Sequence, residues 1–235
     1  YARNDRVGNS YLEQEYESVL SGTKSQWETI TDQSGAVVAR EESYEGKAGD
    51  NLVLTIDIDF QKEIEQIATD FLNSNVDSYN DRIYIVASDP NTGEILGMTG
   101  KQRSTSNEIV DDALGVINSS YGMGSAVKGA MVLTGYMSGV ISADNNVLVD
   151  EPLQFQGSNP KKSVFNPTIG NQVAINDIEA LARSSNVYMI KLAMLMGGQS
   201  TYESGGTLNI SPDLIDELRS YFAQFGLGVK TGIDL

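Results

Sequence analysis

Hydrophobic and polar positions follow two different periods along this chain, and the period predicts which segments form strands and which form helices. Residues 51–56 form an apolar, β-branched run, which is typical of a strand. Residues 60–71 carry apolar side chains at positions i, i+4, i+7, i+8 and i+11, which predicts a helix lying on a core. Asp57 or Asp59 is expected to cap that helix.

A β-hairpin is predicted next, because residues 83–88 and 94–98 are strand-like and flank the turn-forming segment 89–93. A hairpin makes its two strands antiparallel, so the sheet is predicted to be antiparallel. The rest is loop-rich over residues 141–170 and otherwise mainly helical. Helices are predicted from residue 125 to a point between Gly135 and Gly139, and over residues 175–182, 187–196 and 212–225.

Residues 1–50 differ from the rest because they are polar and interrupted by frequent turn signals. One short helix, over residues 11–20, and one short strand, over residues 36–39, are predicted there. We therefore expect two parts: the end of a non-catalytic module in residues 1–50 and a second domain in residues 51–235. A chain of 235 residues suggests one or two domains, which agrees with this division.

The composition excludes several kinds of chemistry. The formal net charge is -16, so no basic face is available for the phosphates of a nucleic acid. The sequence has no histidine, which excludes a Ser–His–Asp triad and a histidine-ligated metal site. It has no cysteine, which excludes disulfides and thiol catalysis. A nucleophilic serine would therefore need a lysine, a carboxylate or a tyrosine as its base.

The best candidate for such a serine is Ser125, which lies in segment 121–133, where glycines precede an apolar helical run. Lys128 follows three residues later, so its amine is expected on the same helix face, within hydrogen-bond reach of the hydroxyl. Burial would lower the pKa of this lysine and make its amine available as a base. The spacing alone also fits a serine that caps a helix beside a solvated lysine, and Ser21–Lys24 and Ser158–Lys161 repeat it.

Five short motifs occur in order along nearly the whole chain. They are Arg6-Val7-Gly8 with Ser10-Tyr11-Leu12-Glu13, Leu52-Val53-Leu54-Thr55-Ile56-Asp57 with Phe60-Gln61, residues 89–96, residues 124–128, and Ser184-Ser185-Asn186. Together they resemble the class B penicillin-binding proteins, which are monofunctional D,D-transpeptidases of peptidoglycan synthesis. The resemblance implies an α+β fold of the serine transpeptidase and β-lactamase type, with an antiparallel sheet and a helical subdomain.

The resemblance also implies the roles of four residues. Ser125 would be the acyl-accepting nucleophile, and Lys128 would be its base. Ser184 would relay protons to the leaving group, and the Asn186 amide would hold Lys128 or the substrate backbone. From the residues alone, Ser184-Ser185-Asn186 also fits a helix-breaking loop with local caps. No cofactor and no metal are expected.

Two departures from the family pattern bear on the site. Gly122-Met123 stands where the family usually has Glu-Pro, which leaves the rigidity of the loop without its usual support. Lys230-Thr231-Gly232 spells the family's third catalytic motif. It lies among glycines and follows Ser184 too closely, so we expect a loop whose lysine points away from Ser125. The catalytic third motif is expected beyond Leu235, and residues 1–235 alone are therefore expected to be inactive.

The activity implied for the full-length protein is peptidoglycan cross-linking by acyl transfer from a D-Ala-D-Ala stem peptide. β-Lactam antibiotics would acylate the same serine and inhibit it. Other expected partners are cell-wall synthesis or division proteins. The chain begins at Tyr1 without a signal-peptide pattern, so the expected location is the outer face of the bacterial plasma membrane, with the N-terminal anchor outside this chain. The alternatives are a serine β-lactamase and a catalytically silent β-lactam-binding scaffold or sensor.

Overall fold

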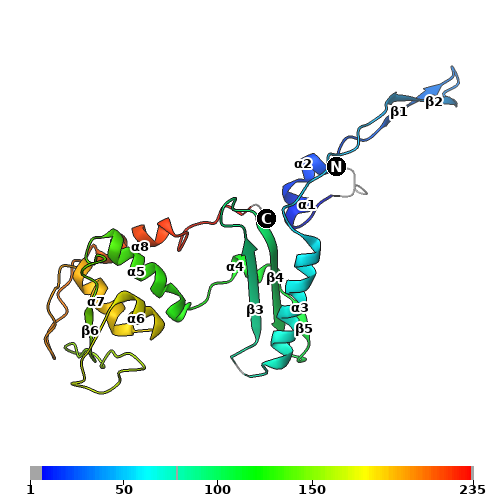
Figure 1. The fold of residues 1–235 in the computed structure, drawn as a ribbon. Helices are drawn as coiled ribbons and strands as arrows, with labels where there is room; N and C mark the ends of the chain where they lie inside the picture. Colours follow the sequence, from blue (N-terminus) through cyan, green and yellow to red (C-terminus); the bar gives the residue numbers. More distant parts are fainter. Residues whose placement is uncertain (1–6, 78, 234–235) are drawn as a thin grey trace. The chain divides into compact units, whose positions relative to one another are not determined.

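The computed structural model describes residues 7–77 and 79–233, so Arg6 of the first motif and Leu235 lie outside the described residues. The described residues divide into two compact units, residues 7–121 with residue 233, and residues 122–232. Each unit combines helices with antiparallel strands (Figure 1). The predicted α+β class is confirmed. The predicted domain boundary at residue 50 lies inside the first unit and stays a prediction.

The first unit begins with two short helices and an exposed hairpin. These elements are α1 (Tyr11–Glu15), α2 (Glu17–Leu20), β1 (Gln26–Thr31) and β2 (Val37–Tyr44). The single helix predicted over residues 11–20 is divided because Tyr16 has non-helical backbone angles (φ −100°, ψ 16°). The strand predicted over residues 36–39 is part of the longer β2, and its antiparallel partner β1 was not predicted.

A three-stranded antiparallel sheet, one long helix and one short helix form the rest of the first unit (Figure 1). The elements are α3 (Ile58–Ser74), β3 (Arg82–Ser88), β4 (Ile95–Arg103), β5 (Ile109–Asp111) and α4 (Gly115–Asn118), with strand order β3-β4-β5. β3 and β4 are the predicted hairpin. Asp57 caps α3 as predicted, because its carboxylate accepts from the backbone N–H groups of Asp59 and Phe60. Ile64 and Ala68 are buried on the face of α3 that lies on β4.

Residues 51–56 do not form the predicted strand. They run as an irregular segment before α3, and Val53 is 89% exposed. The Thr55 hydroxyl donates to the carbonyl oxygen of Ile95 at 2.6 Å, which holds the segment beside the start of β4 without a backbone ladder. Apolar, β-branched composition favours a strand only where a neighbouring strand offers a surface for pairing. The prediction was wrong because no strand pairs with this segment among the described residues.

The second unit is mainly helical and contains the predicted site. Its elements are η1 (a 3-10 turn, Gly124–Val127), α5 (Lys128–Met137), β6 (Leu148–Asp150), β7 (Val173–Ile175), α6 (Asp177–Ala182), α7 (Asn186–Met196) and α8 (Leu214–Gln224). The predicted break between two helices is confirmed, since α6 ends at Ala182 and α7 begins at Asn186. Asn176 forms a reciprocal capping box with Glu179 at the start of α6. The short β6–β7 pair was not predicted.

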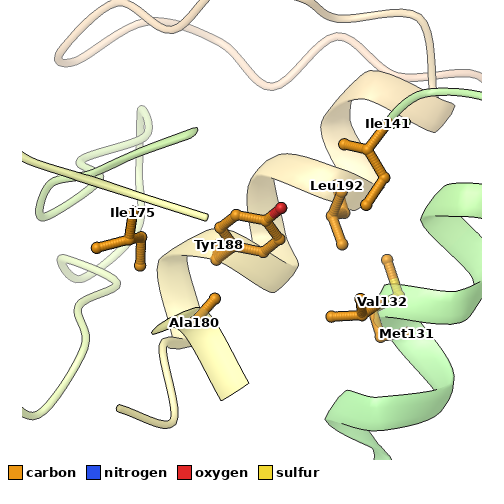
Figure 2. Packing of buried hydrophobic residues seen from close by; sticks show 7 residues of the cluster. All are labelled: Met131, Val132, Ile141, Ile175, Ala180, Tyr188 and Leu192. Atoms are coloured by element: carbon orange, nitrogen blue, oxygen red, sulfur yellow. The ribbon is translucent and has the colours of Figure 1, made fainter. Parts of the chain in front are cut away.

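The core of the second unit brings α5 and α7 together. Figure 2 shows the cluster, whose members are Met131 and Val132 of α5, Ile141, Ile175 of β7, Ala180 of α6, and Tyr188 and Leu192 of α7. Tyr188 and Leu192 are completely buried, and apolar burial of this kind is the main favourable term in folding. Since α5 packs on α7, the start of one helix lies close to the start of the other. This packing places the Ser125–Lys128 segment beside the Ser184–Asn186 triplet.

Candidate active site

Ser125 lies on an exposed turn just before α5. Gly124 in front of it has φ +54°, a left-handed conformation that glycine adopts without the steric cost of a side chain. This conformation starts the 3-10 turn that leads directly into α5. The Ser125 hydroxyl is therefore held on a short, helix-anchored turn and is open to solvent. A group in such a position can reach a bound molecule.

Lys128 is the first residue of α5 and is only 9% exposed. Its ammonium group donates to the Ser184 carbonyl oxygen at 2.7 Å, to the Ser184 hydroxyl at 3.0 Å and to the Asn186 side-chain oxygen at 2.7 Å. These three acceptors match the three N–H bonds that a lysine ammonium offers. The amine is therefore fixed in direction as well as in place.

The environment of Lys128 lowers the pKa of its amine, because burial removes hydration from the charged form. The apolar side chains that line a pocket beside the amine are Val127, Met131, Met189, Ile190 and Phe222. A lowered pKa increases the neutral fraction of the amine at a given pH. Only the neutral amine can accept a proton from a hydroxyl.

Ser184 has a strained backbone conformation that aims it at Lys128. It occupies the position after the C-cap of α6, where its N–H donates to the Leu181 carbonyl at 3.1 Å and the next N–H donates to the Ala180 carbonyl at 2.8 Å. This is the Schellman arrangement, in which glycine is usual, yet Ser184 adopts φ +53° with a side chain. A non-glycine residue there costs about 1–3 kcal/mol, and such strain concentrates at functional sites.

Asn186 is the first residue of α7 and is held from both ends of its amide. Its side-chain oxygen accepts from Lys128 at 2.7 Å, and its side-chain nitrogen donates to the Lys162 carbonyl oxygen at 3.1 Å. The two contacts leave only one orientation of the amide that satisfies both partners. Asn186 therefore holds the Lys128 amine in one position.

The four predicted residues lie together, but the Ser184 hydroxyl lies between the Ser125 hydroxyl and the Lys128 amine. The Ser184 hydroxyl is 3.0 Å from the Ser125 hydroxyl and 3.0 Å from the Lys128 amine. The Lys128 backbone N–H donates to the Ser125 carbonyl oxygen. Within residues 7–77 and 79–233, however, no hydrogen bond joins the Lys128 amine to the Ser125 hydroxyl, which differs from the expected direct contact. The reason is that the three N–H bonds of Lys128 are already used by Ser184 and Asn186. The Lys128 ammonium donates to the Ser184 hydroxyl, which donates to the Ser125 hydroxyl, so the contacts form a continuous path between Lys128 and Ser125 through Ser184.

Lys230 takes no part in this arrangement. It lies in an exposed, irregular segment after α8, as predicted. In the described part of the chain no hydrogen bond or ion pair connects it with Ser125. The motif spelled by residues 230–232 is therefore not part of the site formed by Ser125 and Lys128.

Sequence reasoning missed the residues that support the triplet from behind. Lys162 is 24 residues from Asn186, and buried Asp150 is 35 residues from its partner Ser185. Lys162 and Asp150 lie in the segment that was predicted as loop-rich, and no hydrophobic period or short motif connects either of them with the triplet. Their role depends on tertiary contacts that no local pattern encodes.

Among the described residues, no group of acidic side chains is arranged to hold a metal ion. In the same part of the chain, no helix combines the length and apolarity needed to cross a membrane.

Comparisons with known proteins give one consistent family. Residues 83–235 match the family described as "Penicillin binding protein transpeptidase domain", and residues 1–54 match "Penicillin-binding Protein dimerisation domain". The whole chain is 48% identical to Penicillin-binding protein 2A of Bacillus subtilis, covering 33% of that protein. It is 38% identical to Penicillin-binding protein 2B of Streptococcus pneumoniae, covering 35% of it.

A solved structure of Penicillin-binding protein 2B from Streptococcus pneumoniae is similar to the whole chain. The TM-score is 0.84 at 37% sequence identity, and the match covers 40% of that structure's chain. The chain spans about a third of the length of the curated relatives that it matches.

The burial of Lys128 generates a prediction about its titration. We expect its pKa to lie below the ordinary lysine value of 10.5, because desolvation disfavours the ammonium. Between the folded-state pKa and 10.5 the unfolded chain binds more protons, so the contribution of this group to stability rises with pH across that window. The measurement is an NMR titration of the full-length protein labelled at the lysine ε-carbon, with Lys128→Arg identifying the signal. A pKa at or above 10.5 would show that the desolvation argument is wrong.

Proposed function

The chain belongs to the penicillin-binding protein transpeptidase family, and on that premise we propose that the full-length protein cross-links peptidoglycan by acyl transfer through Ser125. The observation that carries the proposal is the path from the Ser125 hydroxyl through the Ser184 hydroxyl to the Lys128 amine, with 3.0 Å at each step. A serine hydroxyl needs a base to become a nucleophile, and in a chain without histidine this path provides one.

The proposed first step is acylation of Ser125 by a stem peptide that ends in D-Ala-D-Ala. Neutral Lys128 accepts a proton from the Ser184 hydroxyl, which takes the proton of Ser125 as the Ser125 oxygen attacks the carbonyl carbon of the penultimate D-Ala. The C–N bond of the tetrahedral intermediate then breaks. The departing nitrogen of the last D-Ala receives the proton back through Ser184, and an ester remains on Ser125. General base catalysis of this kind contributes roughly 10²–10⁴-fold to the rate.

The second step transfers the acyl group to a neighbouring strand. The amino group of a second stem peptide attacks the ester carbonyl of acylated Ser125, and its proton passes to Lys128. The bond between the carbonyl carbon and the Ser125 oxygen breaks, and Lys128 returns the proton to the Ser125 oxygen through Ser184. A new amide bond joins the two strands. No cofactor is proposed, because the two peptides and the side chains of Ser125, Ser184 and Lys128 supply every atom and proton of both steps.

The contacts of Asn186 support one of its two expected roles. Its amide oxygen is occupied by Lys128 and its amide nitrogen by the Lys162 carbonyl. Asn186 is therefore proposed to hold Lys128 rather than the backbone of the substrate. Loss of the hydrogen bond from Lys128 to Asn186 would let the amine rotate away from the Ser184 hydroxyl.

β-Lactams are proposed to acylate Ser125 by the same step, with opening of the lactam ring in place of D-Ala release. The family match of residues 1–54 supports a transpeptidase over a β-lactamase, because it places a non-catalytic module in front of the catalytic part. The proposed division of the chain into residues 1–50 and 51–235 follows the same reasoning.

The other partners proposed are stem peptides and cell-wall synthesis or division proteins. The proposed location is the outer face of the bacterial plasma membrane, with the anchor in a segment outside these residues.

Two lysines provide a matched test of the site. In the full-length protein, Lys128→Ala is expected to slow acylation by fluorescent penicillin at least about 10²-fold, because it removes the general base. Lys230→Ala removes the exposed lysine of Lys230-Thr231-Gly232, which lies outside the site, and is expected to leave the rate unchanged. Ser125→Ala should abolish the covalent label. Normal labelling of Lys128→Ala, or loss of labelling in Lys230→Ala, would reverse these assignments.

The same labelled proteins separate the alternatives. A transpeptidase stays acylated for long periods, whereas a β-lactamase releases the product and turns over penicillin. Cell growth supported by the full-length Ser125→Ala protein would instead favour a silent scaffold or sensor. Residues 1–235 labelled beside the full-length protein are expected to react far more slowly, since they span about a third of the relatives' length. Equal labelling of the two would contradict that expectation.

A further inference from the structure

Asp150, the last residue of β6, is completely buried behind the Ser184–Asn186 triplet. One carboxylate oxygen accepts from the Ser163 hydroxyl at 2.6 Å and from the Ser185 hydroxyl. The other accepts from the Asn166 side-chain nitrogen at 3.1 Å. Ser163 and Ser185 are also completely buried. In the described part of the chain no basic side chain pairs with Asp150, so neutral donors alone stabilise this buried carboxylate.

The Asp150 carboxylate is the acceptor that both serine hydroxyls share, and the two hydroxyl oxygens also lie 3.2 Å from each other. The Ser163 oxygen accepts from the backbone N–H groups of Asn186 at 3.0 Å and Val187 at 3.2 Å. The Ser185 oxygen accepts from the backbone N–H of Tyr188 at 2.9 Å, as the N-cap of α7. A hydroxyl has one proton and two lone pairs. A carboxylate offers only acceptors, so it directs both protons toward itself and leaves the lone pairs free for the helix.

This network fixes the start of α7 from inside the protein. The N-terminal N–H groups of a helix have no acceptors within the helix, and here the oxygens of two buried serines accept from them. The serines hold Ser185, which follows Ser184, and the backbone of Asn186 in place. Among the described residues, Ser184 and Asn186 together provide the three acceptors of the Lys128 side-chain amine. A shift of Asp150 would therefore move the Ser163 hydroxyl, and with it the backbone of Asn186, whose side chain holds the Lys128 amine.

We propose that Asp150 is a positioning residue for the Ser125 site, acting through Ser163 and Ser185 on the Ser184–Asn186 triplet. The inference rests on the proposed function of that site. Glu151, the next residue, gives the contrast, because it pairs with Lys191 of α7 at 2.7 Å and touches neither serine. Glu151 thus connects the end of β6 with α7 through an ion pair, whereas Asp150 controls the orientation of the Ser163 and Ser185 hydroxyls.

The test compares Asp150→Asn with Glu151→Gln in the full-length protein. Each replaces one carboxylate with an amide at adjacent positions. The amide introduced by Asp150→Asn must direct N–H bonds either at the two serine hydroxyls or at the Asn166 side-chain nitrogen, and both are donors in the native network. Asp150→Asn is expected to slow acylation by fluorescent penicillin about 10–100-fold, since small misplacements of reacting groups have effects of this size. Glu151→Gln keeps an amide oxygen that can accept from Lys191, and Glu151 contacts neither serine, so this variant is expected to stay within about twofold of the wild-type rate.

Two further measurements separate positioning from general destabilisation. The first-order acylation constant should fall in Asp150→Asn, while the affinity for penicillin before acylation stays within about twofold, because the proton path and not recognition is disturbed. In an Asn186→Ala background the effect of Asp150→Asn should shrink at least about threefold, because residues that act through one another are not additive. Ser163→Ala, which removes the direct contact with Asn186, should slow acylation in the same direction. It keeps the inference testable if Asp150→Asn does not fold.

The outcomes distinguish this inference from the proposed function. No labelling of the wild-type protein at Ser125 would remove the proposed function itself. Normal labelling of the wild type together with a wild-type rate in Asp150→Asn or Ser163→Ala would overturn the positioning role alone. An Asp150→Asn defect that is equally large in the Asn186→Ala background would also overturn it, because the defect would then not pass through the triplet.

Discussion

The arrangement of the site depends on one interaction, the three hydrogen bonds of the Lys128 ammonium to Ser184 and Asn186. Burial lowers the pKa of this amine, whereas its oxygen neighbours keep it in place and accept its protons. The two effects oppose each other. Desolvation favours the neutral base, and the acceptors favour the charged form. A site that must take up a proton and return it needs both forms within reach, and the two opposed influences are suited to that requirement.

The backbone around Ser184 makes this interaction possible. A glycine at the same Schellman position would end α6 without strain, but it would bring no hydroxyl to Lys128. The strain at φ +53° is held by structure on both sides, by α6 with its capping box and by α7 with its buried serine N-cap. The buried carboxylate of Asp150 completes that support. Local strain is thus maintained by the packing of α5, α6 and α7 around a shared core.

Local patterns encode part of this structure. The turn residues between β3 and β4 and the cap at Asp57 were predictable because they act over a few residues. The three-residue spacing of Ser125 and Lys128 likewise indicated the candidate site. The strand predicted over residues 51–56 failed because strand formation needs a partner that composition does not reveal. The bridging position of Ser184 and the support from Asp150 join residues that are far apart in the sequence, so only the tertiary structure could identify them.

The most direct test of the proton path is the acylation rate of Ser184→Gly in the full-length protein. Glycine adopts the left-handed conformation of this position without steric cost, so the variant removes the hydroxyl while the backbone is expected to keep its conformation and the protein its thermal stability. If Ser184 connects Ser125 with Lys128, penicillin acylation of Ser125 should fall by about 10²-fold or more. A wild-type acylation rate in a stable Ser184→Gly protein would show that Lys128 activates Ser125 without this hydroxyl, and it would contradict the path proposed here.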